Sequence, residues 1–400
     1  MRVRYTETPG LGIKGTGSVL VARSAVLVPG ITDSQGWRMR VFLTGATGFI
    51  GSHVAEALVA GRHEVTCLVR RRSSRWRLSE VGGKLRYEIG DVEAPGKPAS
   101  VLREHDAVIH LAAYGVSREQ SEYTRALAVN VLGTAQLMIA AAEAGVKRFV
   151  LAGSCMEYGQ RPRHRVQGSG FRELSPRTEV HTMSTVRCPR LDLQRFDGAA
   201  INEDQSLWPC HVYGATKAAA TVVSIGVARQ FGLPLIVLRP FHVFGPREDQ
   251  RKFVPSLICQ ALEGKEIQMT GGEQVRDYCY VGDIAEAFVA AVEAGLGEPA
   301  SEAGGSADDG LATVINLGTG SGRPLAEIAR AVLRHVPEAG PLAVGSLPYR
   351  RGEVWHVVAD VATARRLLGW QATTSLDEGI RRTIEWYRRW RQTMPQASAA

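Results

Sequence analysis

The deciding stretch of this 400-residue sequence reads Val41-Phe42-Leu43-Thr44-Gly45-Ala46-Thr47-Gly48-Phe49-Ile50-Gly51. Its apolar start predicts a short buried strand, and residues 52–60 behind it predict a helix. The three glycines between them, spaced by three, predict a tight turn. Glycines let the backbone approach a pyrophosphate, and free N–H groups at the start of the helix face its negative charge. A purely structural turn is the alternative, but residues further along the chain favour a dinucleotide site.

Similar apolar runs, each ending in small or polar residues, recur along the next hundred residues. They predict four more strands, separated by helical segments, at residues 64–69, 85–89, 108–113 and 146–152. Strands that alternate with helices imply an α/β fold with a parallel, doubly wound sheet of the Rossmann type. Ligands bind such sheets at the carboxyl ends of the strands, where we find Gly45, Arg70, Asp91, Ala112 and Ser154.

The residues after the second strand bear on the choice of cofactor. An acid at this point binds the ribose hydroxyls of NAD, whereas an arginine accommodates the 2′-phosphate of NADP. This chain has Val69 followed by Arg70, Arg71 and Arg72, with no acid. A solvated run of charges is the alternative. The position of Arg70 favours NADP, with NAD also possible.

Composition argues against several classes of partner. The net charge is +8, but the basic residues are scattered, so we expect no nucleic-acid partner. No uninterrupted apolar run approaches the roughly 20 residues of a membrane span, so we expect no membrane partner. The cysteines show no paired spacing and no cluster with histidine, which predicts no metal site and reduced thiols in a cytoplasmic enzyme.

The pattern divides the chain into three parts. Residues 1–38 show no helical or strand period, and we expect a disordered arm or a mis-called leader before a natural start at Met39. Residues 39–245 should form mainly the NAD(P)-binding Rossmann domain, with a long irregular insertion at about 160–208 that is either functional or disordered. Residues 246–395 should form mainly a smaller α/β substrate-binding domain.

A tyrosine and a lysine at the start of a later helix predict the chemistry. Tyr213 and Lys217 are one helical turn apart and share a face. A phenol has a usual pKa of about 10, and we expect the neighbouring ammonium to lower it toward working pH. Ser154 can hydrogen-bond the same substrate oxygen. A Tyr–Lys pair alone is usually a solvated helix face, but after five parallel strands and a glycine turn it predicts hydride transfer.

Together these features resemble an extended short-chain dehydrogenase/reductase of the NAD-dependent epimerase/dehydratase family, which acts mainly on nucleotide sugars. The resemblance covers about residues 39–390. It rests on Thr44-Gly45-Ala46-Thr47-Gly48-Phe49-Ile50-Gly51, Gly90-Asp91, His110-Leu111-Ala112-Ala113, Asn130, Ser154 with Tyr158-Gly159, Tyr213-Gly214-Ala215-Thr216-Lys217, Arg239-Pro240, and Arg276-Asp277-Tyr278 with Tyr280-Val281.

The resemblance implies a role for each matched position. The catalytic triad would be Ser154, Tyr213 and Lys217. The cofactor would contact Gly45, Gly48, Phe49, Ile50, Gly51, Arg70, Asp91, Val92, Leu111, Ala112, Ala113, Tyr213, Lys217, Pro240 and Val243. The substrate would contact His242, Val254, Arg276 and Arg351, since an arginine can donate two hydrogen bonds to a phosphate. The alternative for Arg276 is an ion pair with Asp277 or Asp283.

Departures from the family pattern bear on which reaction this chain catalyses. Its 4,6-dehydratases carry an Asp-Glu pair directly after the catalytic Ser or Thr, where this chain has Cys155-Met156, which disfavours a dehydratase. Residues 154–159 and 347–353 look similar to 4-ketoreductases of deoxysugar pathways. We therefore expect reduction of a nucleotide-linked 4-keto-6-deoxyhexose by NADPH. A nucleotide-sugar 4-epimerase with bound NAD and a non-catalytic NAD(P)-sensing protein are the alternatives. The resemblance also implies a homodimer.

Overall fold

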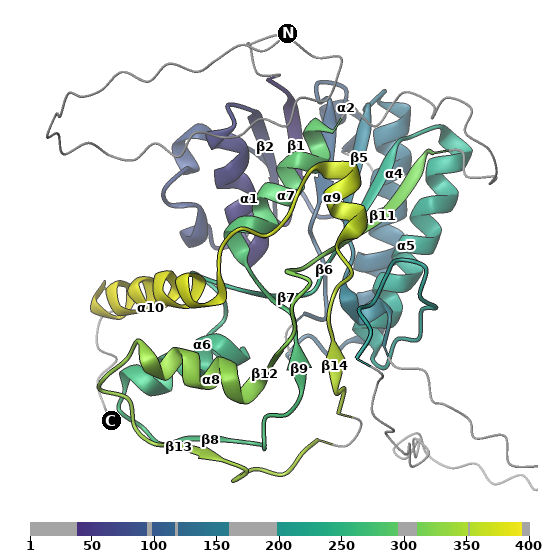
Figure 1. The fold of residues 1–400 in the computed structure, drawn as a ribbon. Coiled ribbons are helices and arrows are strands. Elements are labelled where there is room, and N and C mark those ends of the chain that lie inside the picture. The colour runs from purple at the N-terminus through teal and green to yellow at the C-terminus, as the bar shows by residue number, and fades with distance from the viewer. Residues whose placement is uncertain are drawn as a thin grey trace, which may run out of the picture. The chain divides into compact units, whose positions relative to one another are not determined.

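A computed structural model describes residues 38–93, 98–116, 119–159, 198–294, 310–350 and 353–393. The expectations about the leader up to residue 37, most of the insertion and Arg351 lie outside the described residues. Within those ranges, seven parallel strands form a sheet in the order β11-β6-β5-β4-β1-β2-β3 (Figure 1). The strands are β1 Arg40–Thr44, β2 Glu64–Val69, β3 Arg86–Ile89, β4 Ala107–His110, β5 Arg148–Ala152, β6 Leu235–Pro240 and β11 Ala312–Leu317.

This strand order confirms the predicted Rossmann-type sheet. From β1, the chain adds β2 and β3 on one side and then β4, β5 and β6 on the other. The order therefore reverses between β1 and β4, and such a switch point is where doubly wound sheets bind dinucleotides. The glycine turn follows β1 at this point.

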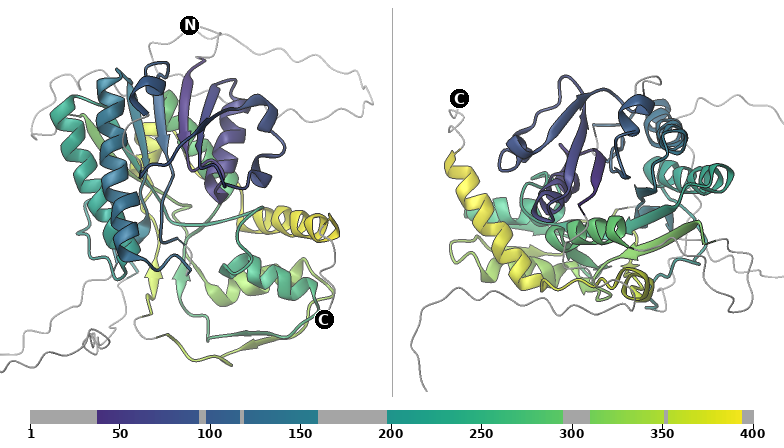
Figure 2. Two further views of the ribbon diagram at one scale, coloured as in Figure 1. Left: turned by 180° about the vertical axis from the view of Figure 1, so that it is seen from behind. Right: turned by 90° about the horizontal axis from the view of Figure 1, so that it is seen from above.

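Helices cover both faces of the sheet (Figures 1 and 2). One layer contains α1 Phe49–Ala60 and α7 Val281–Glu293, and the other contains α2 Pro98–Leu102, α4 Thr134–Glu143 and α5 Val212–Phe231. Side chains alternate along a strand, so Val41 and Leu43 pack into the core beneath α1 and α7, whereas Phe42 packs into the core with residues of α4. Burial on both faces explains the continuous apolar run of β1.

One helical stretch has the length and composition to cross a membrane. Residues Tyr123–Glu143 comprise α3 Tyr123–Leu127, the π-helical segment Ala128–Gly133 and α4, with a mean hydropathy of 1.4. Core helices pass the same test, and α4 packs against α2 and α5. The stretch is therefore weak evidence for a membrane span, and the absence of a membrane partner stays a prediction.

The chain after β6 builds a smaller assembly with its own apolar core, which includes Val254, Ile258, Ile328 and Ile384. Its helices are α6 Phe253–Leu262, α8 Leu325–Arg334 and α10 Leu376–Thr393, and its strands are β7 His242–Phe244, β8 Ile267–Met269, β9 Val275–Arg276, β10 Tyr278–Tyr280, β12 Arg323–Pro324, β13 Leu342–Val344 and β14 His356–Val357. In contrast, α7, β11 and α9 Ala362–Leu368 return to the Rossmann part. The described residues belong to one compact unit, and the boundary at residue 245 stays a prediction.

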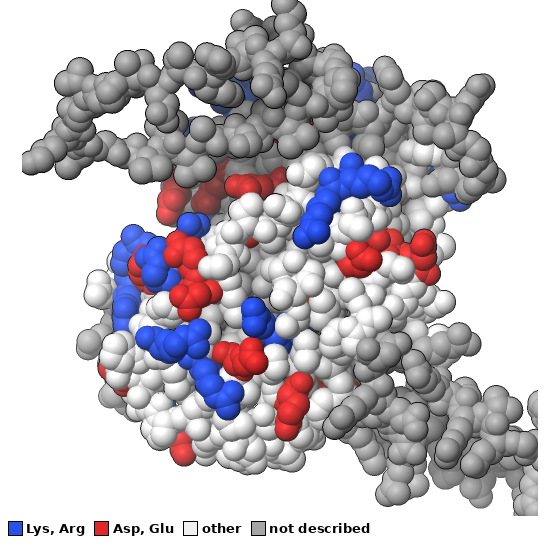
Figure 3. All heavy atoms as spheres, in the orientation of Figure 1, with Lys and Arg blue, Asp and Glu red and all other residues white. Residues whose placement is uncertain are grey.

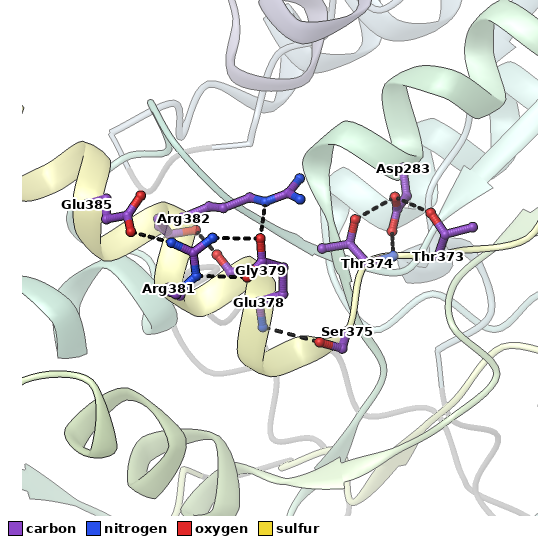
Figure 4. Close-up of polar contacts among 10 residues, drawn as sticks. Asp283, Thr373, Thr374, Ser375, Glu378, Gly379, Arg381, Arg382 and Glu385 are labelled. Carbon is purple, nitrogen blue, oxygen red and sulfur yellow. Dashed lines mark hydrogen bonds and ion pairs between the residues drawn. The ribbon is translucent and has the colours of Figure 1, made fainter. Parts of the chain in front are cut away.

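Asp283 attaches the start of α10 to α7 (Figure 4). Its carboxylate, in the first turn of α7, accepts hydrogen bonds from the Thr374 N–H at 2.9 Å and the Thr374 hydroxyl at 2.8 Å, and from the Thr373 hydroxyl at 3.4 Å. A negative charge there also suits the positive end of the helix dipole. Asp283 thus has a structural role, which bears on the assignment of Arg276 below.

Charges of both signs are mixed on the face drawn in Figure 3. On that face, the basic side chains of the described residues lie among acidic ones rather than in one patch of a single sign. The basic residues are thus interspersed with acidic ones on this face, and the absence of a nucleic-acid partner stays a prediction.

Candidate active site

The glycine turn has the geometry of an anion site. Gly45 has φ of 75°, and an added Cβ would lie 2.6 Å from the carbonyl carbon of Leu111, so this position requires glycine. The Gly48 N–H donates to the Gly45 carbonyl at 2.9 Å, and no side chain caps α1 at Gly48. The first N–H groups of α1 can therefore receive the pyrophosphate of a dinucleotide.

A buried histidine joins the two strands at the switch point. His110 Nδ1 lies 2.6 Å from the Thr44 hydroxyl, and its Nε2 lies 3.0 Å from the Thr134 hydroxyl. The Ala112 N–H donates to the same Thr44 oxygen at 3.2 Å. Burial, with a smaller effect of Lys217, lowers the pKa of His110 to about 3, so the ring is neutral. These contacts fix the ends of β1 and β4 beside the glycine turn.

Asn130 ties the segment after β4 to α5. Its amide oxygen accepts from the Tyr114 N–H at 2.8 Å, and its amide nitrogen donates to the Tyr114 carbonyl and the Thr216 hydroxyl, both at 2.9 Å. It lies in the π-helical segment, a form often found at functional sites. Asn130 therefore sets the distance between the loop after β4 and the helix that carries Tyr213.

The structure brings the three predicted catalytic residues together. Ser154 follows β5, Tyr213 lies in the first turn of α5, and the hydroxyl groups of these two residues are hydrogen-bonded. Lys217 is one turn further along α5 and only 3% exposed. The close approach depends on Gly214, where an added Cβ would lie 2.3 Å from the Met156 carbonyl oxygen. Glycine thus lets α5 pack directly against the turn after Ser154.

The electrostatics of the pair differ from the sequence expectation. Burial, together with Cys155 and Glu157, raises the pKa of Tyr213, and the hydrogen bond with Ser154 opposes this change only in part. The prediction that Lys217 lowers this pKa in the cofactor-free chain is therefore wrong, because desolvation of the phenolate dominates. Burial also lowers the pKa of Lys217 to about 8, against the opposing charge of Glu157. At neutral pH Lys217 is thus an ammonium and Tyr213 a phenol.

The other predicted cofactor residues lie at or near the carboxyl ends of the strands. Arg70 directly follows β2 and is exposed, and its carbonyl accepts from the Ser73 N–H at 2.9 Å. Asp91 follows β3, and its carboxylate accepts from the Glu93 N–H at 3.3 Å. The remaining positions start α1 (Phe49, Ile50, Gly51), follow Asp91 (Val92), follow β4 (Leu111, Ala112, Ala113), end β6 (Pro240) or lie in β7 (Val243). Their roles stay predictions.

The predicted substrate residues have mixed surroundings. Arg276 pairs with Glu353, at 3.2 Å, and not with Asp277 or Asp283 as the alternative for Arg276 held. Its guanidinium also donates to the Val275 carbonyl at 3.0 Å. The ring of His242 lies 5.2 Å from that of Tyr278, and His242 Nδ1 is buried without a hydrogen-bond partner among the described residues. Val254 lies inside the core of the smaller assembly.

Sequence reasoning missed a cluster of charged residues behind the glycine turn. Arg77 donates to the Thr47 carbonyl at 3.4 Å and to the Arg247 carbonyl at 2.9 Å. Arg247, at φ of 69°, donates to the Glu56 carboxylate of α1 at 2.5 Å and to His53 Nδ1 at 2.9 Å. The two arginines are 170 residues apart, and no local pattern indicates that they meet.

Comparisons with known proteins agree with this geometry. The sequence profile described as NAD dependent epimerase/dehydratase family matches residues 41–185 and 193–303. A UDP-glucose 4-epimerase of Mycolicibacterium smegmatis is 29% identical over 366 residues, which cover 88% of this chain and 99% of that protein. A solved structure, MoeE5 in complex with UDP-glucuronic acid and NAD, is 30% identical with a TM-score of 0.66 and covers 88% of this chain and 99% of that one.

A third relative is a plant protein with several activities. It is a trifunctional UDP-glucose 4,6-dehydratase/UDP-4-keto-6-deoxy-D-glucose 3,5-epimerase/UDP-4-keto-L-rhamnose-reductase of Arabidopsis thaliana. It is 26% identical over 367 residues, which cover 87% of this chain. This chain spans about half of that protein's length, 47%.

Proposed function

Because this chain belongs to the NAD-dependent epimerase/dehydratase family, as an enzyme of the extended short-chain dehydrogenase/reductase type, we propose that it transfers hydride at carbon 4 of a nucleotide-linked sugar. One observation carries this proposal: Ser154, Tyr213 and Lys217 are assembled on the carboxyl-end side of β5 and the start of α5, in a Rossmann sheet whose glycine turn suits a pyrophosphate. A structural turn alone would not need this triad.

The residues present fit a nicotinamide dinucleotide. The glycine turn offers the N–H groups at the start of α1, and Asp91 and Arg70 follow neighbouring strands where the adenosine half would lie. When bound, the nicotinamide supplies or accepts the hydride. Tyr213 would exchange a proton with the sugar oxygen at carbon 4, Ser154 would hydrogen-bond that oxygen, and the ammonium of Lys217 would lie beside the nicotinamide ribose.

The nucleotide diphosphate of the substrate would lie near α6 and β9. Because the Val254 side chain is buried, its contact would come from its backbone N–H, which is one of the unpaired donors in the first turn of α6. Arg276 would donate to a phosphate in place of Glu353. Arg351 stays a proposed contact. Two of the relatives described above are named for UDP-linked sugars, and the MoeE5 structure is a complex with one, which supports this class of substrate.

For the reaction itself, we propose reduction of a 4-keto-6-deoxyhexose by NADPH. Cys155-Met156 after Ser154 lacks the acid and base of an elimination. The exposed Arg70 directly follows β2, where an arginine suits the 2′-phosphate of NADP. A 4-epimerase with bound NAD is the rival, supported by the epimerase relative and by the NAD in the MoeE5 structure. A cytoplasmic location also stays a proposal.

A homodimer is part of the proposal, because large apolar side chains are exposed on neighbouring helices. They are Tyr123 and Leu127 of α3, Leu132 of the π-helical segment, and Val222 and Val223 of α5. These segments contact each other, so the side chains can form one apolar face. Burying such a face against a second copy would remove it from water.

Purified protein should be assayed with nucleotide-linked 4-keto-6-deoxyhexoses and NADPH or NADH, and with UDP-glucose and UDP-glucuronic acid for epimerisation. Consumption of NADPH with a 4-keto sugar supports the reductase, whereas tightly bound NAD with sugar isomerisation and no net oxidation supports the epimerase. If Tyr213→Phe left the activity in the cell unchanged, the non-catalytic, NAD(P)-sensing alternative would hold instead.

A further inference from the structure

A buried glutamate lies directly behind the catalytic triad. Glu157 is 0% exposed and lies in the short 3-10 helix Cys155–Glu157 that follows Ser154. One carboxylate oxygen accepts from the Ser154 N–H at 2.8 Å. The other accepts from the Thr221 hydroxyl at 2.9 Å and from Arg239 Nε at 2.9 Å. The carboxylate therefore joins the ends of β5 and β6 to the side of α5.

The contact with α5 is on the catalytic face of that helix. Tyr213, Lys217 and Thr221 are spaced by four residues, so they follow one another on one face. Because Thr221 donates to Glu157 and Tyr213 is hydrogen-bonded to Ser154, the turn from Ser154 to Glu157 holds this face at two points. Lys217 lies between those two points.

The titratable groups of this cluster come from four elements. Burial disfavours the charged forms of His110 of β4 and Tyr213 of α5, whereas the charge of Glu157, beyond β5, acts to raise the pKa of Lys217. Arg239, 3% exposed, is paired with Glu157 at 2.8 Å and also donates to the Tyr158 hydroxyl at 2.9 Å. Glu157 is thus the negative group that faces the Lys217 ammonium in the described part of the chain.

We infer that Glu157 is a positioning residue of this site: it fixes Ser154 against α5 and places its carboxylate on the helix face that carries Lys217. Arg239 compensates the rest of the carboxylate charge and holds it in place. The dehydratases of the family have their acidic pair at the positions of Cys155 and Met156. In this chain the acidic side chain that contacts Ser154 and α5 is the next residue, Glu157. The effect on catalysis rests on the proposed function, but the effect on Lys217 does not.

The test measures the titration of Lys217 directly, without cofactor or substrate. Full-length protein with isotope-labelled lysine is titrated by NMR, and the Lys217 signal is identified by its loss in Lys217→Met. Burial sets the pKa of this group to about 8. Glu157→Gln keeps the shape and removes the charge, so the midpoint should fall by about one pH unit or more.

Glu203→Gln is the matched control. Glu203 also accepts from a backbone N–H, that of Asn316 at 2.8 Å, and from a threonine hydroxyl, that of Thr363 at 3.1 Å. The charge of Glu203 does not contribute to the pKa shift of Lys217, so its variant should leave the midpoint unchanged. A Lys217 midpoint that is the same in folded Glu157→Gln and in the parent protein would overturn the inference.

A second variant covers the case in which Glu157→Gln fails to fold because Arg239 is left buried without its partner. In Glu157→Gln with Arg239→Met both charges are gone, and the Lys217 midpoint should again fall. The two proposals fail separately. If the Lys217 midpoint falls in Glu157→Gln but the parent protein turns over no sugar, the role of Glu157 is supported and the proposed reaction is refuted. If the parent turns over sugar but the midpoint is unchanged, the reaction is supported and the role of Glu157 is refuted. If the protein turns over sugar, kcat should decrease as the pH rises and Lys217 loses its proton, and this decrease should occur at a lower pH in Glu157→Gln than in the parent.

Discussion

The replacement Lys217→Met should make the cofactor-free protein more stable while it removes activity. Burial lowers the pKa of Lys217 from its usual 10.5 to about 8. Since each pKa unit corresponds to about 1.4 kcal/mol, holding this ammonium inside the protein costs about 3 kcal/mol of folding free energy at neutral pH. Methionine has a similar length and no charge, and Glu157 keeps Arg239 as its partner.

The stability gained by Lys217→Met should depend on pH in a defined direction. Between pH 8 and 10.5 the unfolded chain binds more protons at Lys217 than the folded protein does, so this group makes the parent more stable as the pH rises. The advantage of Lys217→Met should therefore be largest below pH 8 and should shrink toward pH 10.5.

Urea denaturation of the two proteins, freed of NAD(P), measures this difference at several pH values. The cofactor must be removed, because a ligand that binds only the folded state adds its own stabilisation. Lys147→Met is the control, because Lys147 is exposed and its pairing with Asp106 at the surface should contribute less than about 1 kcal/mol. If Lys217→Met were less stable than the parent at pH 7, or if its gain did not change with pH, the argument from burial would be refuted.

Three more predictions concern packing, cofactor and assembly. Gly214→Ala should lower kcat at least ~100-fold by moving Tyr213 from Ser154, which steady-state kinetics checks. Gly226→Ala is the control: Gly226 faces open space on the same helix, so this variant should gain about 0.5–1 kcal/mol of stability, which denaturation checks. Arg70→Ser should weaken NADPH binding ~10-fold or more by calorimetry and leave NADH binding unchanged; equal losses would contradict a 2′-phosphate contact. Leu132→Glu should yield monomers by sedimentation, unlike Val344→Glu on β13, which is also exposed; a dimeric Leu132→Glu would count against the proposed interface.

The sequence was sufficient for the first five strands of the sheet because their signals are local. The run at 64–69 has the same bounds as β2, and the apolar stretches before Gly45 and after Gly145 became β1 and β5. Parallel strands bring their carboxyl ends to one edge of the sheet. Ser154 follows β5 at that edge and Tyr213 lies in the first turn of the next long helix, α5, so the order of elements along the chain indicated that they are close. The glycine turn was also predictable, because its three glycines lie close together in the sequence.

Features that depend on distant residues were not predictable. Glu157 and Arg239 are 82 residues apart, and nothing near either one indicates the other. Arg276 was predicted to contact the substrate, and the alternative named only nearby acids as its ion-pair partner, but Glu353 is 77 residues away. The expected effect of Lys217 on Tyr213 failed because it considered one neighbouring charge and not burial, which has the larger effect here. Sequence spacing alone carries no information on the depth of a side chain.

The central claim is that this chain moves hydride between a bound nicotinamide and carbon 4 of a nucleotide sugar, while Tyr213 exchanges a proton with the oxygen at that carbon. The most direct measurement uses NADPH and NADH deuterated at the transferable position, nucleotide-linked 4-keto-6-deoxyhexoses, a single turnover, and mass spectrometry with NMR of the product. We predict deuterium at carbon 4 with the parent protein and none with Tyr213→Phe. If folded, cofactor-bound parent protein left carbon 4 unlabelled with every such sugar, or if Tyr213→Phe labelled it equally well, the claim would be contradicted.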